Sequence, residues 1–408
     1  MHVIGAGLAG LAAAVRLAAC GEAITLYEAA PQAGGRCRSY QDPTLDLLID
    51  NGNHLLLSGN QEALSYLAAI GAQNRVMGPP RAEFPFVDLK TAQRWQILIN
   101  DGRLPFWIFF EKTRVPGSSA TDYFEGGKLL FGAEGKTVGE ILDRHRPLYE
   151  KLWRPFFVAA LNTDLTEASA KLAAAIMRGT LLKGGRACRP LIARKSLAYA
   201  FIVPALLFLK QHKAEINLSS RARALSFEGT LIRAIDFGDR LVEVAADDRV
   251  ILAVPPWVAS ALIPGLVTPT EYRAIVNAHF RHQPAIGTAP MIGIINGLSE
   301  WIFAFEDHIS VTISAADRLL ETSREELAKQ IWGEIQLAMR IAEPLPAWQI
   351  VKEKRATFVA TPEQDMRRPE ARTQWTNLVL AGDWTATGLP ATIEGSIASG
   401  HKAAELSR

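Results

Sequence analysis

A glycine-rich turn at the start of the chain constrains its fold more than any other feature. The run Val3-Ile4-Gly5-Ala6-Gly7-Leu8-Ala9-Gly10 places the pattern GxGxxG between a short apolar segment and a stretch rich in alanine and leucine. This arrangement predicts a strand over residues 2–5, a helix over residues 8–19 and a second strand over residues 23–27. Such a β-turn-α-β unit indicates an α/β fold.

The residues of this turn have separate tasks in a phosphate-binding loop. Gly5 allows the tight turn, Gly7 lets the backbone approach a pyrophosphate, and Gly10 lets helix and strand pack closely. Leu8 and Ala9 open the helix, whose N-terminus faces the phosphates. We therefore expect these five residues to contact a dinucleotide.

An acid follows at the spacing that nucleotide binding requires. Glu28 comes about twenty residues after the turn, at the end of the second predicted strand, where a carboxylate accepts hydrogen bonds from a ribose hydroxyl. The turn and this acid fit NAD and FAD equally well.

Three further segments resemble the FAD enzymes of the amine oxidase superfamily. Gly34-Gly35-Arg36 resembles their GGR motif, in which the glycines allow close approach and the arginine lies along the pyrophosphate. The segment Asp50-Asn51-Gly52-Asn53-His54 resembles one that passes near the flavin ring, so Gly52, Asn53 and His54 are expected there. Val250 lies in a third segment, residues 248–257, and is expected on the adenine side or in core packing.

The end of the chain resembles the second half of the same cofactor site. Leu380-Ala381-Gly382-Asp383-Trp384 indicates a strand and a turn, and a predicted helix over residues 391–405 follows. We expect Gly382 and Asp383 near the ribityl chain or the phosphates of FAD. Leu389, Thr392 and Ile393 are expected at the flavin, because the helix dipole favours electron density at its pyrimidine edge.

The middle of the chain resembles one family within this superfamily, the squalene-associated FAD-dependent desaturases of bacterial hopanoid synthesis. The likeness covers nearly the whole chain, although residues 80–135 match less clearly and Asn53 stands where the family is expected to have glutamine. The segments that carry it are residues 152–156, 160–163, 168–170, 311–318 and 351–358, and the sequence TGLPATIEG at residues 387–395.

The resemblance implies a two-part architecture. The expected fold is α/β, with a Rossmann-like FAD-binding domain of the glutathione-reductase and amine-oxidase type interleaved with a mixed α+β substrate domain. The predicted FAD-binding domain comprises residues 1–58, 212–262 and 372–408. The predicted substrate domain comprises residues 59–211 and 263–371.

The resemblance also implies a reaction, in which reduced FAD converts hydroxysqualene to squalene and water. This chemistry needs a proton donor and a dry, apolar site. His54 and Arg154 are the predicted catalytic residues, and the charged run at residues 352–355 is a further candidate, because alternate residues of a strand reach opposite faces. Trp153 and Asn162 are expected to line the cavity.

Other functions stay open at this point. A polyene dehydrogenase similar to phytoene desaturase would remove a hydride from its substrate, and a non-redox isomerase would use reduced FAD without net oxidation. An amine oxidase is less favoured, because no aromatic cage can be located in the sequence. A lipid-binding protein would not need two intact halves of a cofactor site.

Composition limits the partners. Lys and Arg number 44 against 42 Asp and Glu, and this balance argues against a nucleic-acid binder. The three scattered cysteines indicate neither a metal site nor a disulfide. An isoprenoid lipid substrate predicts peripheral membrane contact, through residues 104–110 or 197–209, and a cytoplasmic location at the inner face of the cytoplasmic membrane. The electron donor is not indicated, because no second GxGxxG is present.

Overall fold

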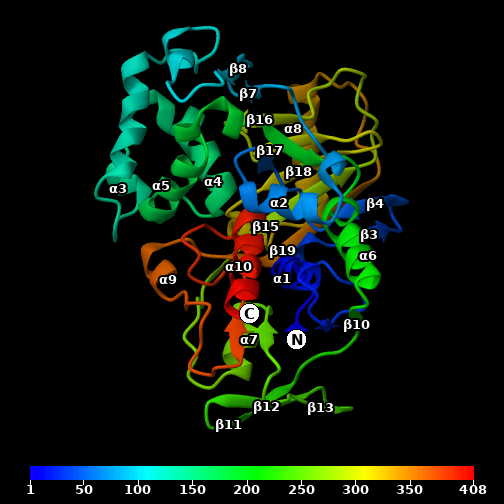
Figure 1. Ribbon diagram of the computed structural model, residues 1–408. Helices are drawn as coiled ribbons and strands as arrows, with labels where there is room; N and C mark the ends of the chain where they lie inside the picture. The colour runs from blue at the N-terminus through cyan, green and yellow to red at the C-terminus, as the bar shows by residue number, and fades with distance from the viewer.

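The predicted β-turn-α-β unit lies at the centre of the lower half of the molecule in Figure 1, a computed structural model that describes residues 1–408. Strand β1 (His2–Ile4), helix α1 (Leu8–Ala19) and strand β2 (Thr25–Tyr27) follow one another as predicted. The small side chains of α1 are almost all buried, which allows the helix to lie close to the sheet.

This half is organised by a five-stranded parallel sheet in the order β10-β2-β1-β14-β20. The first strand pairs with a strand from the middle of the chain, β14, and β14 pairs with β20 near the end. The predicted α/β fold with a Rossmann-like unit is confirmed, whereas the exact domain boundaries stay a prediction. The three later strands are β10 (Glu215–Asn217), β14 (Val250–Leu252) and β20 (Leu378–Leu380).

The first and last helices of the chain lie side by side (Figure 1). Gly400 on α10 (Ile393–Leu406) comes so close to α1 that an added Cβ would lie 2.2 Å from the carbonyl oxygen of Ala9. Further along, Arg16 donates a hydrogen bond of 2.8 Å to Glu405. The two chain ends therefore form one packed layer.

A small antiparallel sheet and several short elements complete this half. Asn377 ties the small sheet to the parallel one, because its amide donates to the carbonyl of Ile232 over 2.9 Å and accepts from the Ile232 amide over 2.8 Å. The elements are β3 (Ser39–Asp42), β4 (Leu47–Asp50), α2 (Gln61–Ala69), β11 (Ala224–Glu228), β12 (Leu231–Asp236), β13 (Leu241–Glu243), α7 (Pro256–Leu262) and α9 (Pro362–Met366).

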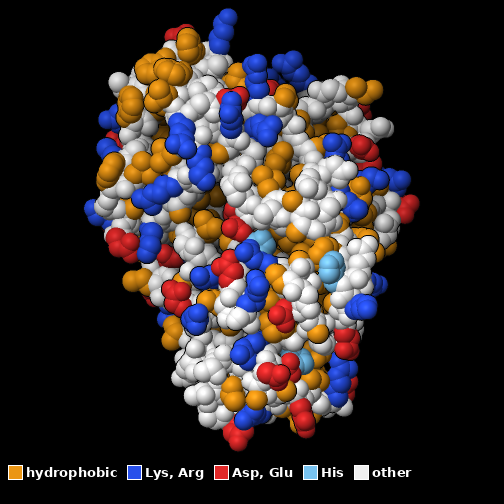
Figure 2. All heavy atoms as spheres, viewed as in Figure 1, with side chains coloured by type: hydrophobic (Ala, Val, Ile, Leu, Met, Phe, Trp, Pro, Cys, Tyr) orange, Lys and Arg blue, Asp and Glu red, His pale blue; other side chains and the backbone are white.

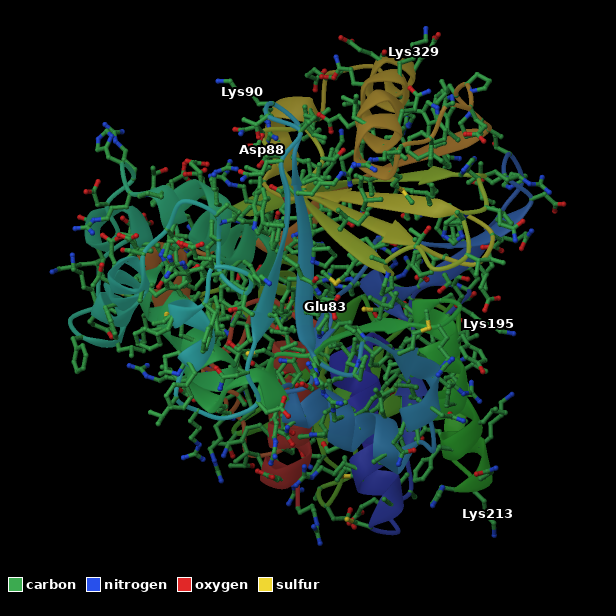
Figure 3. The ribbon with its side chains drawn as sticks, turned by 90° about the horizontal axis from the view of Figure 1, so that it is seen from above. Glu83, Asp88, Lys90, Lys195, Lys213 and Lys329 are labelled. Carbon is green, nitrogen blue, oxygen red and sulfur yellow. The ribbon has the colours of Figure 1, made fainter.

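The upper half contains a seven-stranded sheet in the order β19-β15-β18-β17-β16-β7-β8. Neighbouring strands run antiparallel, except that β7 and β16 are parallel. Helix α8 (Arg324–Met339) buries one face against this sheet. Figure 3 shows the arrangement from above, with Glu83 and Asp88 on β7 and Lys329 on α8. The strands are β7 (Ala82–Asp88), β8 (Arg94–Ile99), β15 (Tyr272–Phe280), β16 (Met291–Ile295), β17 (Trp301–Ala304), β18 (Ile309–Ile313) and β19 (Trp348–Phe358).

A mainly helical segment follows β8 and lies beside the sheet, at the upper left in Figure 1. The segment contains the 3-10 helices η3 (Phe106–Phe109), η4 (Ala120–Leu130) and η6 (Leu181–Lys183), and helices α3 (Val138–Ile141), α4 (Arg154–Leu161) and α5 (Ala170–Gly179). Strand β9 (Pro190–Ala193) follows and pairs with β5 (Leu56–Leu57) and β6 (Val76–Met77). Helix α6 (Val203–Gln211) comes next, on the right in Figure 1.

Asn100-Asp101-Gly102 is a sequence typical of a hairpin turn, but no hairpin forms there. Strand β8 pairs with β7, which precedes it, and the chain enters η3 after Gly102. Asn100 directs this course, because its side chain accepts from the Trp107 amide over 3.1 Å and donates to the Leu104 carbonyl over 2.9 Å. The asparagine therefore organises a loop rather than a two-strand turn.

The apolar stretch at residues 197–209 is part of the core. Phe201 and Leu209 are fully buried in the same hydrophobic cluster as α1. The prediction that this stretch docks on a membrane is therefore wrong for most of its length. No helix of the structure combines the length and the apolar character that crossing a bilayer requires.

Candidate active site

A continuous cavity of about 1570 Å³ extends from the glycine turn to the seven-stranded sheet and the helical segment. Figure 2 shows a hollow near the middle of one face, with hydrophobic side chains inside it. Its lining contains Gly7, Arg36 and Asp383 from the parallel-sheet half, and Phe86 and Trp153 from the upper half. The cavity thus joins a polar groove to an apolar chamber.

The glycines of the turn divide their tasks as the sequence predicts. A Cβ on Gly10 would lie 1.8 Å from the Gly5 carbonyl oxygen, so this position serves the packing of helix on strand. Gly5 has a φ of +106° and belongs to the turn itself. A Cβ on Gly7 would meet no protein atom within 4 Å, and Gly7 lines the cavity. The open space above Gly7 fits the approach of a pyrophosphate to the backbone.

Glu28 lies in the cavity lining at the end of β2. One carboxylate oxygen accepts from the Ala6 amide and the other from the Ala30 amide, each over 2.8 Å. A carboxylate has about four acceptor positions, so two stay available for ribose hydroxyls. The side chain both fixes the turn and fits the predicted nucleotide contact.

Arg36 and Asp383 meet across the polar end of the cavity. The guanidinium of Arg36 donates to the Asp383 carboxylate over 2.6 Å and to the Ala356 carbonyl over 2.5 Å. Its remaining N–H groups are free for phosphate oxygens, and part of the side chain stays accessible. Asp383 was expected to bind the cofactor directly, but the oxygen nearest Arg36 is used to hold that arginine.

The start of helix α10 closes the polar end. Leu389, Thr392 and Ile393 line the cavity, as does Gly382. The hydroxyl of Thr392 accepts from the Gly395 amide over 3.1 Å and caps the helix. The helix N-terminus, with its partial positive charge, is therefore fixed at the cavity wall.

His54 and Asn53 line the cavity beyond Arg36. Asn53 is fixed to the sheet, because its amide donates to Ser310 over 2.7 Å and to Thr312 over 3.2 Å. Burial, with the positive charge of Arg36, lowers the pKa of His54 to about 4. The imidazole is neutral at neutral pH, so it can donate a hydrogen bond but is not the strong acid that the sequence prediction requires.

Gly52 lines the cavity and also lies close to the seven-stranded sheet. A Cβ there would lie 2.9 Å from the side-chain amide nitrogen of Asn277 on β15. The expected approach of Gly52 to the flavin stays a prediction.

Arg154 and Val250 are predicted site residues that the structure does not bring to the cavity. Arg154 lies on α4 with its guanidinium 3.6 Å from Asp164 and 3.9 Å from Glu150, while the adjacent Trp153 lines the cavity. Helix geometry turns successive side chains by about 100°, so the two neighbours face different surroundings. Val250 is fully buried within the parallel sheet.

The charged run on β19 is divided between two environments. Lys352 donates to the carbonyl oxygens of Leu320 and Thr322, away from the cavity. Lys354 lines the cavity and makes no hydrogen bond or ion pair. Arg355 also lines it and lies over the Trp257 ring at 4.9 Å.

The apolar chamber uses residues that the sequence analysis did not single out. Strands β7, β8 and β17 supply aromatic and aliphatic side chains that alternate with those on the opposite face of the sheet. These residues are Phe84, Phe86, Ile97, Ile99 and Trp301, and they are joined by Trp107, Leu152, Trp153, Phe156 and Ile176 from the helical segment.

Comparison with known families agrees with this geometry. The family model described as flavin containing amine oxidoreductase matches residues 8–406. The chain belongs to this family of flavoenzymes. A solved structure of an oxidoreductase from Methanosarcina mazei superposes with a TM-score of 0.72 at 15% identity, covering 99% of each chain, which supports the fold.

Curated relatives place the chain more narrowly. It is 51% identical to a protein of Sinorhizobium fredii named hydroxysqualene dehydroxylase, over 100% of this chain and 97% of that protein. It is also 51% identical to a Rhodopseudomonas palustris protein of the same name, with the same coverage. The resemblance to the squalene-associated group, drawn from the middle segments, is confirmed.

FAD is the cofactor for which these residues are suited. The open backbone at Gly7, the acceptors of Glu28 and the free N–H groups of Arg36 match pyrophosphate and ribose. The polar groove continues into the apolar chamber, so a flavin ring bound beyond the pyrophosphate would face that chamber.

Proposed function

We propose that this enzyme reduces hydroxysqualene to squalene with loss of water, at the expense of reduced FAD. One structural observation carries the proposal: the FAD groove opens into a chamber to which β7, β8, β17 and the helical segment contribute ten aromatic and aliphatic side chains, which suits a long hydrocarbon. A polyene dehydrogenase is not favoured, because the two relatives that are 51% identical over the full chain share the dehydroxylase name.

The protein has two tasks in this reaction. Reduced FAD supplies a hydride when bound. The C–O bond of an allylic alcohol breaks when the departing hydroxyl is protonated, and the resulting cation must be kept from water. The aromatic side chains of Phe86, Trp153 and Trp301 line the chamber, so they confine the hydrocarbon chain and exclude solvent.

We propose Lys354 as the proton donor to the leaving hydroxyl. Lys354 lines the cavity, carries an amine that can transfer a proton, and forms no ion pair with a carboxylate. The carbonyl oxygen of Ala356, on the same strand, accepts a hydrogen bond from Arg36. This part of β19 therefore lies where the polar groove meets the chamber. His54, neutral in the same cavity, would position the hydroxyl through its N–H group.

A lipid substrate also implies a place of action. We infer peripheral contact with the inner face of the cytoplasmic membrane, where a hydrocarbon of this length would dissolve.

An anaerobic single turnover tests the proposal. The FAD-loaded enzyme would be reduced with dithionite, mixed with hydroxysqualene in detergent, and followed by flavin absorbance and lipid extraction. Squalene formed in amounts equal to the flavin reoxidised is the expected result. Intact FAD binding without squalene would overturn the substrate assignment, and desaturation of a polyene by the oxidised enzyme would favour the dehydrogenase instead.

A further inference from the structure

The most unusual surface of the molecule is a group of exposed aromatic and aliphatic side chains on the helical segment. Phe109, Phe110 and Phe131 are 58%, 61% and 79% exposed. Figure 2 shows hydrophobic side chains gathered at the upper left, over the segment drawn in cyan in Figure 1. We call this group the aromatic surface; it comprises Leu104, Phe106, Phe109, Phe110, Phe124, Phe131 and Leu182.

Three separate chain segments form this surface, and ring contacts and hydrogen bonds join them. The rings of Trp107 and Tyr123 meet edge to face at 4.9 Å, which links η3 to η4. The Gly185 amide donates to the Asn100 carbonyl over 2.8 Å, which links the loop before η3 to the chain after η6. The group is therefore one folded unit rather than scattered side chains.

The same unit carries an excess of positive charge. Residues 100–131 and 178–189 contain eight Lys and Arg against four Asp and Glu, whereas the whole chain is nearly balanced. Arg103, Lys112 and Arg186 are exposed beside the aromatic surface. Exposed phenylalanines bordered by basic side chains match the interface of a bilayer that contains anionic lipid.

The aromatic surface lies next to the apolar chamber. Trp107 and Leu181 belong to η3 and η6, the elements that carry Phe109 and Leu182, and both line the cavity. A hydrocarbon leaving a bilayer at this surface would pass to the chamber without crossing the polar groove.

We propose that the aromatic surface docks the enzyme on an anionic phospholipid bilayer and admits the lipid substrate to the chamber from that side. The inference deepens the proposed function by assigning the source of the substrate. It selects residues 104–131 with η6, and it rejects residues 197–209, which are mostly buried.

Flotation with lipid vesicles tests this docking directly. The FAD-loaded full chain would be centrifuged with vesicles of phosphatidylcholine alone, and with vesicles that also contain phosphatidylglycerol. We expect flotation with the anionic vesicles and at least about tenfold less with the neutral ones. Absence of flotation with anionic vesicles, or equal flotation with both, would overturn the proposal.

Matched variants identify the surface. The combined change Phe109→Ser, Phe110→Ser and Phe131→Ser should lower binding to anionic vesicles at least about tenfold. The control, Ile286→Ser, Leu337→Ser and Met366→Ser, removes equally exposed apolar side chains from other elements and should change binding less than about twofold. Equal effects of the two triple changes would refute the assignment.

Charge reversal gives an independent arm. The combined change Arg103→Glu, Lys112→Glu and Arg186→Glu should reduce binding to anionic vesicles at least about tenfold. The control change Lys210→Glu, Lys213→Glu and Lys329→Glu should not reduce it.

Sedimentation of the aromatic variant tests whether a second copy of the chain covers this surface instead. Conversion of a dimer to a monomer with unchanged flotation would show that the surface joins two copies, and would overturn the membrane assignment.

Flotation requires no turnover, so a negative flotation result can be distinguished from a failure of the proposed reaction. The aromatic variant should form squalene at the wild-type rate from detergent-dispersed substrate and at least about tenfold more slowly from vesicle-borne substrate. If flotation depends on the aromatic surface but the enzyme makes no squalene, the proposed reaction is refuted and the proposed membrane docking is supported.

Discussion

The guanidinium of Arg36 donates a hydrogen bond of 2.6 Å to the carboxylate of Asp383, which lies 347 residues later in the chain. The arginine comes from the GGR motif and the acid from the turn after β20, so this pair joins the two halves of the cofactor site. The hydrogen bond to Asp383 fixes the orientation of the Arg36 guanidinium. The remaining N–H groups of Arg36 therefore have a defined direction.

Replacing Asp383 with Asn should weaken FAD binding about tenfold, since a charge-assisted hydrogen bond is worth roughly 1.5–3 kcal/mol. Titration of the apoprotein with FAD, followed by flavin fluorescence, measures this change. Arg16→Ala is the matched control, because Arg16 and Glu405 also join the two ends of the chain over 2.8 Å but lie on the surface. A similar loss in both variants would mean that general stability, not the orientation of Arg36, is responsible.

Two glycines of the turn should separate folding from cofactor binding. Gly7→Ala meets no protein atom within 4 Å, so we expect an apoprotein melting temperature within about 2 °C of wild type and FAD binding weakened at least tenfold. Gly10→Ala would place its Cβ 1.8 Å from the Gly5 carbonyl oxygen and should lower the melting temperature itself. Unchanged FAD affinity in Gly7→Ala would contradict the location of the pyrophosphate.

The proton donor can be identified by pH dependence and substitution. Lys354→Met should slow the single turnover about 100-fold or more, the usual contribution of a general acid. Because the pKa of His54 is lowered to about 4, its protonation should leave no inflection in the rate between pH 5.5 and 8. An inflection in that range that disappears in His54→Gln would restore His54 as the acid. Arg154→Ala, outside the cavity lining, should keep the wild-type rate.

A second histidine should make stability depend on pH. His279 is fully buried, and burial, with the charge of His308, lowers its pKa to about 3. An unfolded histidine titrates near 6.5, so the unfolded chain binds more protons and stability falls as pH drops below about 6.5. At pH 5 the loss is up to about 2 kcal/mol.

Urea unfolding at pH 7 and pH 5 measures this effect. His279→Asn should reduce the difference in unfolding free energy between the two pH values, because its side chain can still accept from Ser310. His145→Asn changes an exposed histidine and should leave the difference intact. An unchanged difference in His279→Asn would assign the pH dependence to other groups.

The cofactor half could be predicted because its signals are local. The GxGxxG turn, Glu28 and Gly35-Arg36 lie within one unit of the chain, and each has a backbone or charge requirement that few residue types meet. The structure adds the partners: the sequence suggests that Arg36 faces phosphate, but only the fold brings Asp383 and Ala356 to hold it.

The substrate half could be predicted only in part, because its lining is assembled from distant strands. Phe86 and Trp301 look like ordinary core residues, since nothing local separates a side chain that faces a chamber from one that faces packing atoms. Arg154 shows the reverse error: it follows Trp153 directly, yet the helix turns it toward Asp164 and away from the cavity. Likewise Gly52 is constrained by Asn277, a contact across 225 residues that no spacing reveals.

The close packing of α10 on α1, fixed at Gly400 and Ala9, has a consequence for biosynthesis. During translation the glycine turn leaves the ribosome long before β20 and α10. Until those two elements are made, the parallel sheet is unfinished and the face of α1 that packs on α10 is exposed. Prematurely terminated chains would lack Asp383 and the wall at Thr392, so retention of yellow flavin during purification should distinguish completed molecules from truncated ones.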